Sequence, residues 1–327
     1  MVSKTEIVKS FNTWFILLLI LSILLLIFMY FRSKKHFEGF SQKERYTMNR
    51  GQDAYDEFYA GIYDLLYKSE ERAKYEAEQI VLATQPDTEF SRFLDIGCGT
   101  GCLVETVRDL GYQVVGVDKS AAMIRSGQEK RGSCELIRGD AQDSMLFDRG
   151  SFTHILCMNG TVYEFRDKVN FFRNCSHWLR PGGYLVVHLV NPTKFDPIIP
   201  IGNTFGNPYG NALDKKTLGL GKSRVYDSPQ EYSKSRITGS IVDFIDFKYK
   251  SAYDFDQLNT TGTVVQIETF TDAETNHVRQ NEHTRYMAKE RDILAEAEFC
   301  GFVLAGKFTM ERYNRDAHQT VYILQKM

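Results

Sequence analysis

Nine residues, Phe93–Gly101 (FLDIGCGTG), constrain the fold of this 327-residue chain more than any other stretch. A short apolar segment ends in Asp95, and Gly97, Gly99 and Gly101 alternate through the turn that follows. Glycine has no Cβ, so the backbone can come close to a ligand. The helix expected next would offer unpaired N–H groups to the same site. The pattern therefore predicts a strand, a ligand-binding turn and a helix.

The turn does not fit the common phosphate-binding motifs. The dinucleotide pattern G-x-G-x-x-G would need glycine where Cys102 stands, and no G-K-[ST] follows to form a P-loop. The carboxylate of Asp95 would repel a phosphate and attract a cation. We therefore expect a ligand that brings an amine, rather than a phosphate, to this turn.

Strands and helices alternate on both sides of the turn, which predicts a parallel sheet covered by helices on both faces. The polar residues between 193 and about 290 interrupt this alternation with short alternating segments, which predict an inserted antiparallel sheet. The expected strands are 93–96, 113–117, 134–138, 154–158, 184–190, 302–305 and 318–325, with insert strands at 240–249, 264–270 and 278–286. The expected helices lie within 52–83 and at 103–110, 121–128, 168–179 and 289–298.

Acidic or polar groups also follow the next three strands, at the edge where ligands bind in an open α/β sheet. Asp118 stands seventeen residues after Gly101, a position from which a carboxylate can accept both ribose hydroxyls. Asp140 and Ala141 could read an adenine edge, and Asn159 follows the fourth strand. Upstream, Tyr59 and Tyr63 lie on a helix that could cover the pocket or simply pack in the core.

The order and spacing of these motifs over residues 52–192 and 289–327 resemble class I methyltransferases that use S-adenosyl-L-methionine, whose first motif is D-x-G-x-G-x-G. The resemblance implies a Rossmann-like, mostly parallel seven-stranded sheet with the insert as a substrate cap. It also implies that the glycine turn faces the methionine part of the donor. The implied cofactor-binding residues are Tyr59, Tyr63, Asp95, Gly97, Cys98, Gly99, Gly101, Asp118, Lys119, Asp140, Ala141 and Asn159.

Methyl transfer asks the protein to align an acceptor with the donor and to exclude water, and a hydroxyl acceptor usually needs a base. The candidates for these catalytic roles are Asn159, Tyr163, Glu164 and His188. His188 is more simply a histidine packed within the sheet, and Glu164 is equally well a solvated residue at a helix start. Alternate residues from Arg279 to Arg285 would share one face of a strand. That face would either line a substrate pocket or meet water.

Residues 14–31 (WFILLLILSILLLIFMYF) form an apolar run that only Ser22 interrupts. As a helix it would reach about 27 Å, close to the hydrocarbon thickness of a bilayer. We therefore expect residues 1–36 to be an uncleaved membrane anchor, 37–50 a linker and 51–327 the catalytic domain. The basic residues after the run favour a cytosolic catalytic domain.

Composition limits the partners. The net charge is −2 and no long basic run is present, which argues against nucleic acid as the main partner. Six scattered cysteines without a C-x-x-C pair predict reduced thiols. We expect a small-molecule or lipid-like N or O acceptor and no metal. The alternatives are a protein or RNA methyltransferase, or a non-catalytic cofactor-binding scaffold at a membrane.

Overall fold

The computed structural model describes residues 14, 17–26, 44–197 and 239–327. The chain divides into two units, Met1–Glu38 and Gly39–Met327. In the first unit, residues 17–26 are helical and their large apolar side chains are exposed. Among the residues described, no helix is both long and apolar enough to cross a bilayer. The expected anchor at 14–31 lies in part outside them, because residues 15, 16 and 27–31 are not described.

The second unit contains, in its described part, a mixed sheet of seven strands in the order β11-β12-β6-β5-β2-β3-β4. Four of the six strand pairings are parallel, and the two pairings of β12 are antiparallel. The inner strands are mostly buried apolar runs, as expected for a sheet covered on both faces, whereas the edge strands β4 and β11 are largely exposed. The strands are β2 (Arg92–Ile96), β3 (Gln113–Asp118), β4 (Glu135–Arg138), β5 (Phe152–Cys157), β6 (Leu179–Val190), β11 (Phe302–Thr309) and β12 (Gln319–Lys326).

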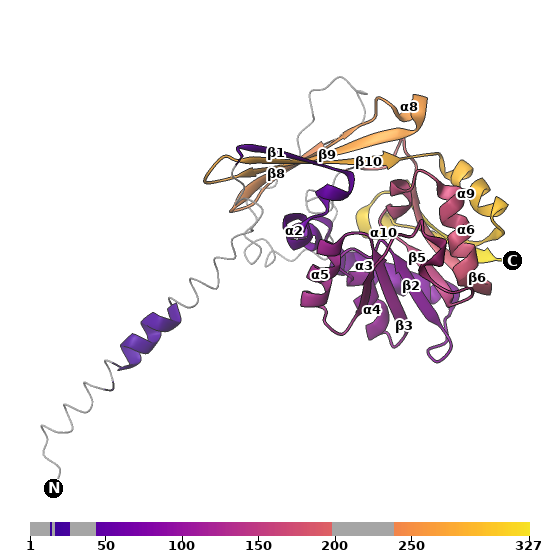
Figure 1. Cartoon of the computed structure of the whole chain (residues 1–327), viewed down its shortest axis with the longest axis horizontal. Helices are drawn as coiled ribbons and strands as arrows, with labels where there is room; N and C mark the ends of the chain where they lie inside the picture. Colours follow the sequence, from indigo (N-terminus) through magenta and orange to yellow (C-terminus); the bar gives the residue numbers. More distant parts are fainter. Residues whose placement is uncertain (1–13, 15–16, 27–43, 198–238) are drawn as a thin grey trace, which may run out of the picture. The chain divides into compact units, whose positions relative to one another are not determined.

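Helices cover both faces of this sheet (Figure 1). One face packs against α3 (Ser69–Thr84), α4 (Cys102–Asp109) and α5 (Ala121–Lys130), around a core that includes Leu156 and Val186. The other packs against α6 (Lys168–Trp178) and α9 (Glu290–Phe299). The alternation predicted from the sequence is confirmed, and this Rossmann-like arrangement brings the ends of β2, β3, β4 and β5 to one edge.

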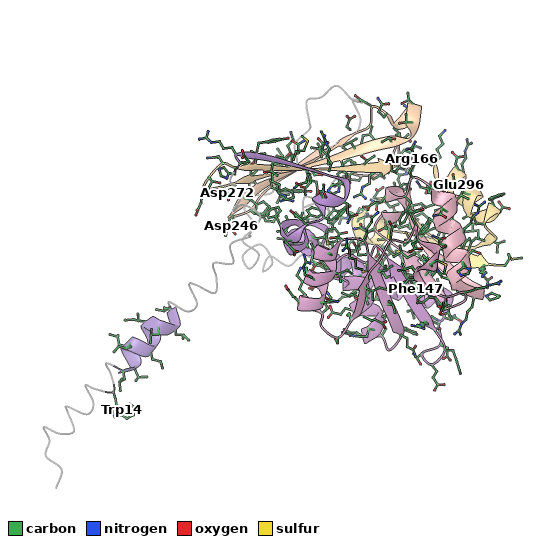
Figure 2. The ribbon with its side chains drawn as sticks, in the orientation of Figure 1. Trp14, Phe147, Arg166, Asp246, Asp272 and Glu296 are labelled. Atoms are coloured by element: carbon green, nitrogen blue, oxygen red, sulfur yellow. The ribbon has the colours of Figure 1, made fainter. Side chains whose placement is uncertain are left out.

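A five-stranded sheet, the cap sheet, has the order β1-β10-β9-β8-β7 among the described residues. Its strands are β1 (Tyr46–Arg50), β7 (Gly239–Asp243), β8 (Phe247–Asp254), β9 (Thr263–Asp272) and β10 (Val278–Tyr286), with the short helix α8 (Leu258–Thr261) before β9. The insert is antiparallel as predicted. Asp246 and Asp272 lie side by side at one end, where Phe247 pairs with Asp272 (Figure 2).

Several boundaries differ from the sequence prediction; β6 begins at Leu179 rather than 184, β11 ends at Thr309 rather than 305, and three further differences change the elements themselves. The predicted linker 37–50 ends in a strand, because β1 pairs in parallel with β10. The single strand predicted at 240–249 is two strands joined by a tight turn, which the alternating pattern alone cannot reveal. The predicted helical region 52–83 is split into a short 3-10 helix η2 (Gly51–Ala54), α2 (Glu57–Tyr67) and α3, because Lys68 has φ 47°.

Candidate active site

One cavity of about 1200 Å³ lies at the carboxyl edge of the seven-stranded sheet, between the strand ends, α2 and the cap sheet. We call the part beside β2, β3 and β4 the donor lobe, and the part beneath β9 and β10 the acceptor lobe. The cavity is lined by these residues predicted from the sequence: Tyr59, Tyr63, Gly97, Gly99, Asp118, Lys119, Asp140, Ala141, Asn159, Tyr163, Glu164 and His188. Asp95, Cys98 and Gly101, also predicted, do not line it.

The glycine turn has the conformation that its sequence requires. Gly97 has φ 68°, and a Cβ on it would stand 2.4 Å from the Cγ2 of Thr161. Gly99 has φ 54° and faces the ring of Tyr63, which a Cβ would meet at 3.5 Å. Such φ values strain any other residue. The turn thus presents bare backbone to the donor lobe, with the Tyr63 ring over it.

Asp118 ends β3 within the donor lobe. One carboxylate oxygen accepts the Gly99 N–H at 2.9 Å and the other accepts the Ser120 N–H at 2.8 Å. Burial raises the pKa of Asp118 to about 6, against these two hydrogen bonds, which lower it. A carboxylate oxygen has two acceptor sites, so each can still take a hydroxyl hydrogen.

Asp140 and Lys119 form an ion pair at the rim of the same lobe, with 2.7 Å between Nζ and Oδ2. Burial raises the pKa of Asp140, but the hydrogen bonds from Lys119 and the Gln142 N–H outweigh it and hold that pKa below its usual range. The carbonyl oxygen of Ala141 accepts the side-chain amide of Asn174 at 2.9 Å. Asp140 is therefore ionised, and the ion pair holds the Lys119 side chain at the rim of the donor lobe.

The structure places two predicted cofactor residues differently from the sequence interpretation. Asp95 is 3% exposed at the end of β2. Burial raises its pKa well above the usual value, and the carboxylates of Glu76 and Asp118 add to the rise. The sulfur of Cys98 points toward β3, where a Cβ on Gly116 would meet it at 2.9 Å. Neither residue lines the cavity.

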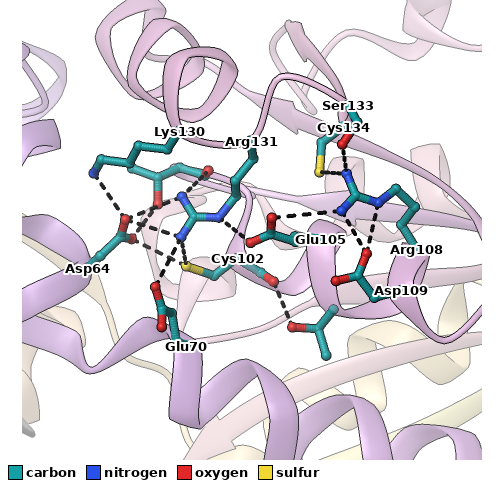
Figure 3. Close-up of polar contacts among 12 residues, drawn as sticks. Asp64, Glu70, Cys102, Glu105, Arg108, Asp109, Lys130, Arg131, Ser133 and Cys134 are labelled. Atoms are coloured by element: carbon teal, nitrogen blue, oxygen red, sulfur yellow. Dashed lines mark hydrogen bonds and ion pairs between the residues drawn. The ribbon is translucent and has the colours of Figure 1, made fainter.

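An ion-pair network that the sequence did not predict fastens α2 to the glycine turn (Figure 3). The carboxylate of Asp64 accepts hydrogen bonds from the Thr100 hydroxyl and from Lys130 at 3.1 Å. Arg131, at the end of α5, lies 3.4 Å from Asp64 and 2.9 Å from Glu105. Because Asp64 follows Tyr63 in α2, this network holds the Tyr63 ring over the turn.

Four tyrosines spaced by four residues form one wall of the cavity: Tyr55, Tyr59, Tyr63 and Tyr67. Their successive ring centroids lie 5.6, 5.8 and 4.8 Å apart. This spacing places Tyr59, Tyr63 and Tyr67 on one face of α2, and Tyr55 precedes the helix. The Tyr63 hydroxyl accepts a hydrogen bond from the side-chain amide of Asn159 at 2.9 Å, and Asn159 has φ 50°. Tyr63 and Asn159 thus join the two lobes.

Glu164 stands between α2 and the cap sheet, and its side chain is 38% exposed, so it meets solvent as one of the two sequence interpretations held while it also lines the cavity. Its carboxylate accepts hydrogen bonds from the Tyr55 hydroxyl and the Arg285 guanidinium. Burial raises its pKa, but Arg285 and the Tyr55 hydrogen bond outweigh burial and hold the pKa below its usual range. Arg285 also donates to Gln266 at 3.3 Å, and Gln266 donates to Tyr67 at 3.1 Å.

The polar face of β10 turns inward. Arg279, Asn281 and His283 are each 5% exposed or less, and His283 and Arg285 line the cavity. His283 pairs with the buried Glu268 at 2.7 Å, and Glu268 also accepts the Tyr249 hydroxyl at 2.5 Å. Thus His283 and Arg285 stand in the cavity wall, whereas Arg279 and Asn281 are buried against Asp56 and the Ala54 carbonyl.

The remaining catalytic candidates differ from one another. The hydroxyl of Tyr163 donates to the Val190 carbonyl at 3.2 Å and accepts its N–H at 2.8 Å, so it braces the end of β6. His188 is buried, and neither ring nitrogen makes a hydrogen bond of ordinary geometry with a described residue. Burial and the Arg72 charge lower its pKa well below the usual value, while the nearby Gln319 amide opposes them. His188 is therefore a neutral imidazole.

Comparisons with known proteins agree with this geometry. Residues 94–187 match the family described as "Methyltransferase domain". The chain is 36% identical over 102 residues to a ubiquinone biosynthesis O-methyltransferase of Bradyrhizobium sp. (strain ORS 278), covering 31% of this chain and 40% of that protein. It is 30% identical over 111 residues to the protein of the same name from Xanthomonas oryzae pv. oryzae (strain PXO99A), covering 33% and 46%. The chain thus matches less than half the length of these relatives.

Solved structures share the fold over most of the chain. An S-adenosylmethionine-dependent methyltransferase from Clostridium acetobutylicum gives a TM-score of 0.53 at 19% identity and covers 82% of this chain and 97% of its own. CalS10, an amino pentose methyltransferase from Micromonospora echinaspora with its donor bound, gives 0.53 at 17%, with 81% and 97% covered. CcbJ from Streptomyces caelestis gives 0.55 at 17%, with 84% and 98% covered. Together the matches support a methyltransferase domain that uses S-adenosyl-L-methionine.

Proposed function

We propose that this protein transfers a methyl group from S-adenosyl-L-methionine to a nitrogen or oxygen of a small or lipid-like acceptor. The observation that carries the proposal is the single cavity with two chemically different lobes. Its volume of about 1200 Å³ exceeds the 300–1,000 Å³ that is typical for one drug-sized ligand. A donor and an acceptor can therefore be held together in it.

The donor supplies an activated methyl group, so the protein's task is binding and alignment. In our proposal, Asp118 accepts the two ribose hydroxyls, and Asp140 with Ala141 meets the adenine. The backbone of Gly97 and Gly99 faces the methionine part, which the Tyr63 ring covers. Asp95 takes part from behind the turn rather than by direct contact.

The acceptor lobe favours a polar acceptor with an apolar body. Phenol rings supply the apolar surface, while Glu164, Arg285 and Gln266 supply fixed hydrogen-bonding groups. An amine acceptor must reach the methyl group in its neutral form, and a hydroxyl acceptor must lose a proton. His188 is neutral and lines the cavity, so it is our candidate to take that proton. The ionised Glu164 orients the acceptor instead.

The comparisons leave the acceptor atom between two chemistries. The curated relatives are named as O-methyltransferases of ubiquinone biosynthesis, whereas CalS10 is named as an amino pentose methyltransferase. The first name specifies an oxygen acceptor, and the second an amino sugar. A wall of four tyrosines accommodates a flat ring or a cationic amine, the latter through cation–π contact. Both acceptor classes therefore belong in the assay.

We further propose that residues 14–31 anchor the protein in a membrane, with the catalytic domain on the cytosolic side. The sequence supports this through eighteen residues broken only by Ser22 and through the basic residues that follow. The test is extraction of the full chain from membranes by alkaline carbonate, followed by protease protection. Release into the supernatant contradicts the anchor, and a protected catalytic domain contradicts the orientation.

The activity is tested on the purified full chain by calorimetric titration with S-adenosylhomocysteine, followed by transfer of a labelled methyl group to fractionated lipid, phenol, amine, protein and RNA pools. We expect binding and labelling of a small-molecule or lipid pool. Absence of binding refutes the enzyme proposal. Binding without labelling of any pool supports the scaffold, and labelling of the protein or RNA pool supports the other alternative.

A further inference from the structure

The acceptor lobe contains a carboxylate oxygen that the fold leaves unused. Glu164 ends the short 3-10 helix η4 (Thr161–Glu164), which follows β5. Its Oε1 accepts hydrogen bonds from the Tyr55 hydroxyl and from Arg285, whereas Oε2 has no hydrogen-bond partner among the described residues. The side chain lines the cavity and is 38% exposed. A carboxylate that is held by one oxygen therefore offers the other to an acceptor.

Glu164 is ionised although the protein surrounds it. Burial raises its pKa, but the charge of Arg285 and the hydrogen bond from Tyr55 outweigh burial. The charge of Glu164 also acts at the junction of the two lobes, where, after burial, it is one of the causes that raise the pKa values of Asp118 and Tyr63. A negative charge thus stands close to the place where donor and acceptor meet.

Phenol rings form the wall beside this oxygen. Tyr55 and Tyr67 line the cavity with Glu164, and a ring face attracts a cation as a carboxylate does. Arg285 opposes a cation, but its guanidinium is directed at Glu164 Oε1 and, at 3.3 Å each, at the Tyr55 hydroxyl and Gln266. The lobe therefore favours a cation through Oε2 and the ring faces rather than through a large net charge.

The two acceptor classes move charge in opposite ways. An amine gives up one N–H proton, to His188 in the proposed function, and keeps the electron pair on nitrogen. That pair forms the bond to the methyl carbon while the carbon–sulfur bond breaks and leaves its electrons on sulfur. Positive charge thus develops on nitrogen, whereas a phenolate loses its negative charge in the same step. A fixed carboxylate and ring faces stabilise the first change and repel a phenolate.

We propose that the acceptor is an amine, and that Glu164 with the ring of Tyr55 selects it over a phenol. The inference rests on the proposed function, because it names the acceptor class of the same cavity. The amine donates an N–H to Oε2 both before it loses its proton and after it gains the methyl group. Glu164 is then a specificity residue, and it does not take the proton.

The first experiment compares a charged probe with a neutral one of similar shape. The full chain is saturated with S-adenosylhomocysteine and titrated calorimetrically at neutral pH with benzylamine, which is cationic, and with benzyl alcohol, which is neutral. We expect benzylamine to bind more tightly. The Glu164→Gln variant should lose about tenfold in affinity for benzylamine and nothing for benzyl alcohol. The variant keeps an oxygen for the Tyr55 and Arg285 hydrogens, so its fold should be retained.

Glu71→Gln is the matched control, because Glu71 lines the cavity from α3 and is exposed there. It should bind both probes as the wild type does, and a loss as large as that of Glu164→Gln refutes the inference. The same conclusion follows if benzylamine does not bind, if benzyl alcohol binds the wild type as tightly, or if Glu164→Gln weakens both probes equally.

The second experiment separates this inference from the proposed function. The wild type and Glu164→Gln are given the labelled methyl donor with the amine and phenol pools. We expect the wild type to label the amine pool, and the ratio of amine to phenol labelling to fall about tenfold in the variant. Labelling of the phenol pool alone refutes the inference and leaves the methyltransferase proposal standing. If S-adenosylhomocysteine does not bind to the wild type, the proposed function fails first.

Discussion

The two lobes of the cavity are lined by different kinds of chemical group. The donor lobe uses backbone groups and short acidic side chains at successive strand ends, such as Gly97, Gly99 and Asp118. The acceptor lobe uses long side chains from segments far apart in the sequence, such as Tyr55 of the chain before α2 and Arg285 of β10. The donor lobe depends on local backbone shape, whereas the acceptor lobe depends on buried side-chain pairs. Substitutions in the two lobes should therefore fail in different ways.

The largest expected effect is on stability, in the acceptor lobe. The His283→Leu variant leaves the carboxylate of Glu268, which is 0% exposed, without its imidazole partner. Breaking a buried pair in this way costs about 3–5 kcal/mol. We expect the free energy of unfolding in urea to fall by that amount, while the affinity of the remaining folded protein for S-adenosylhomocysteine is unchanged.

The pH dependence of the stability loss, and a control substitution at a second histidine, test whether the loss comes from breaking the pair with Glu268. Burial raises the pKa of Glu268, but His283 and Tyr249 outweigh burial and bring it below the usual value. This stabilisation is present above the pKa of an unfolded glutamate and is lost as the pH falls, so the gap between wild type and His283→Leu should narrow in acid. His154 is equally buried but has no carboxylate partner, and burial lowers its pKa to about 4. His154→Leu should cost far less, and an equal cost would contradict the pairing argument.

A substitution in the donor lobe should weaken the binding of S-adenosylhomocysteine rather than the stability of the fold. Asp118→Asn removes the charge that we propose receives the ribose hydroxyls, and hydrogen bonds to charged groups contribute about 1.5–3 kcal/mol. We therefore expect a ten- to hundredfold weaker affinity for S-adenosylhomocysteine by calorimetry. The melting temperature should stay within a few degrees of wild type, because burial already makes this carboxylate costly. A large fall in melting temperature with unchanged affinity would reverse the comparison.

The same residue should set the pH dependence of binding. The pKa of Asp118 in the free protein is about 6, and the ionised form is the one that accepts hydroxyl hydrogens. Affinity should therefore be constant above pH 7 and fall as the pH drops through 6, by up to about tenfold per further pH unit. Asp118→Asn should show no such step, and a step that survives in this variant would point to another group.

The contrast also explains what the sequence could predict. Glycine spacing and strand-end acids report local backbone shape, so the donor turn, Asp118 and Asp140 could be placed from the chain alone. The position of Arg72 in the cavity wall depends on how α3 packs against β6 and α10 (Glu311–Asn314), and no local sequence pattern encodes that packing. The same is true of Asp64, whose partners come from the glycine turn and from the end of α5. The burial of Asp95 could not be read from the sequence either, because a strand-end acid can face the ligand edge or the core.

A smaller effect is expected from alanine at the glycine turn, where backbone strain can be separated from steric collision of the added Cβ. Gly97→Ala combines a φ of 68° with a Cβ that would stand 2.4 Å from Thr161. Gly182→Ala has a similar φ of 77° but nothing within 4 Å of the added atom. Conformational strain of this kind costs about 1–3 kcal/mol. Both variants should lose stability, and only Gly97→Ala should also lose affinity for S-adenosylhomocysteine. Equal affinity in the two would show that the turn tolerates a side chain.

The smallest effect should come from Tyr163→Phe, at the junction of the two lobes. The variant keeps the ring but removes the hydroxyl that binds both the N–H and the carbonyl of Val190, so the end of β6 loses its brace. A hydrogen bond of this kind contributes about 1 kcal/mol, and urea unfolding should show a loss of that order. If Tyr163 acts only through β6, the affinity for S-adenosylhomocysteine and the pH profile of methyl transfer should keep their wild-type shape. A displaced pH profile would instead place the phenol among the catalytic residues, since only a group that exchanges a proton with the acceptor can move it.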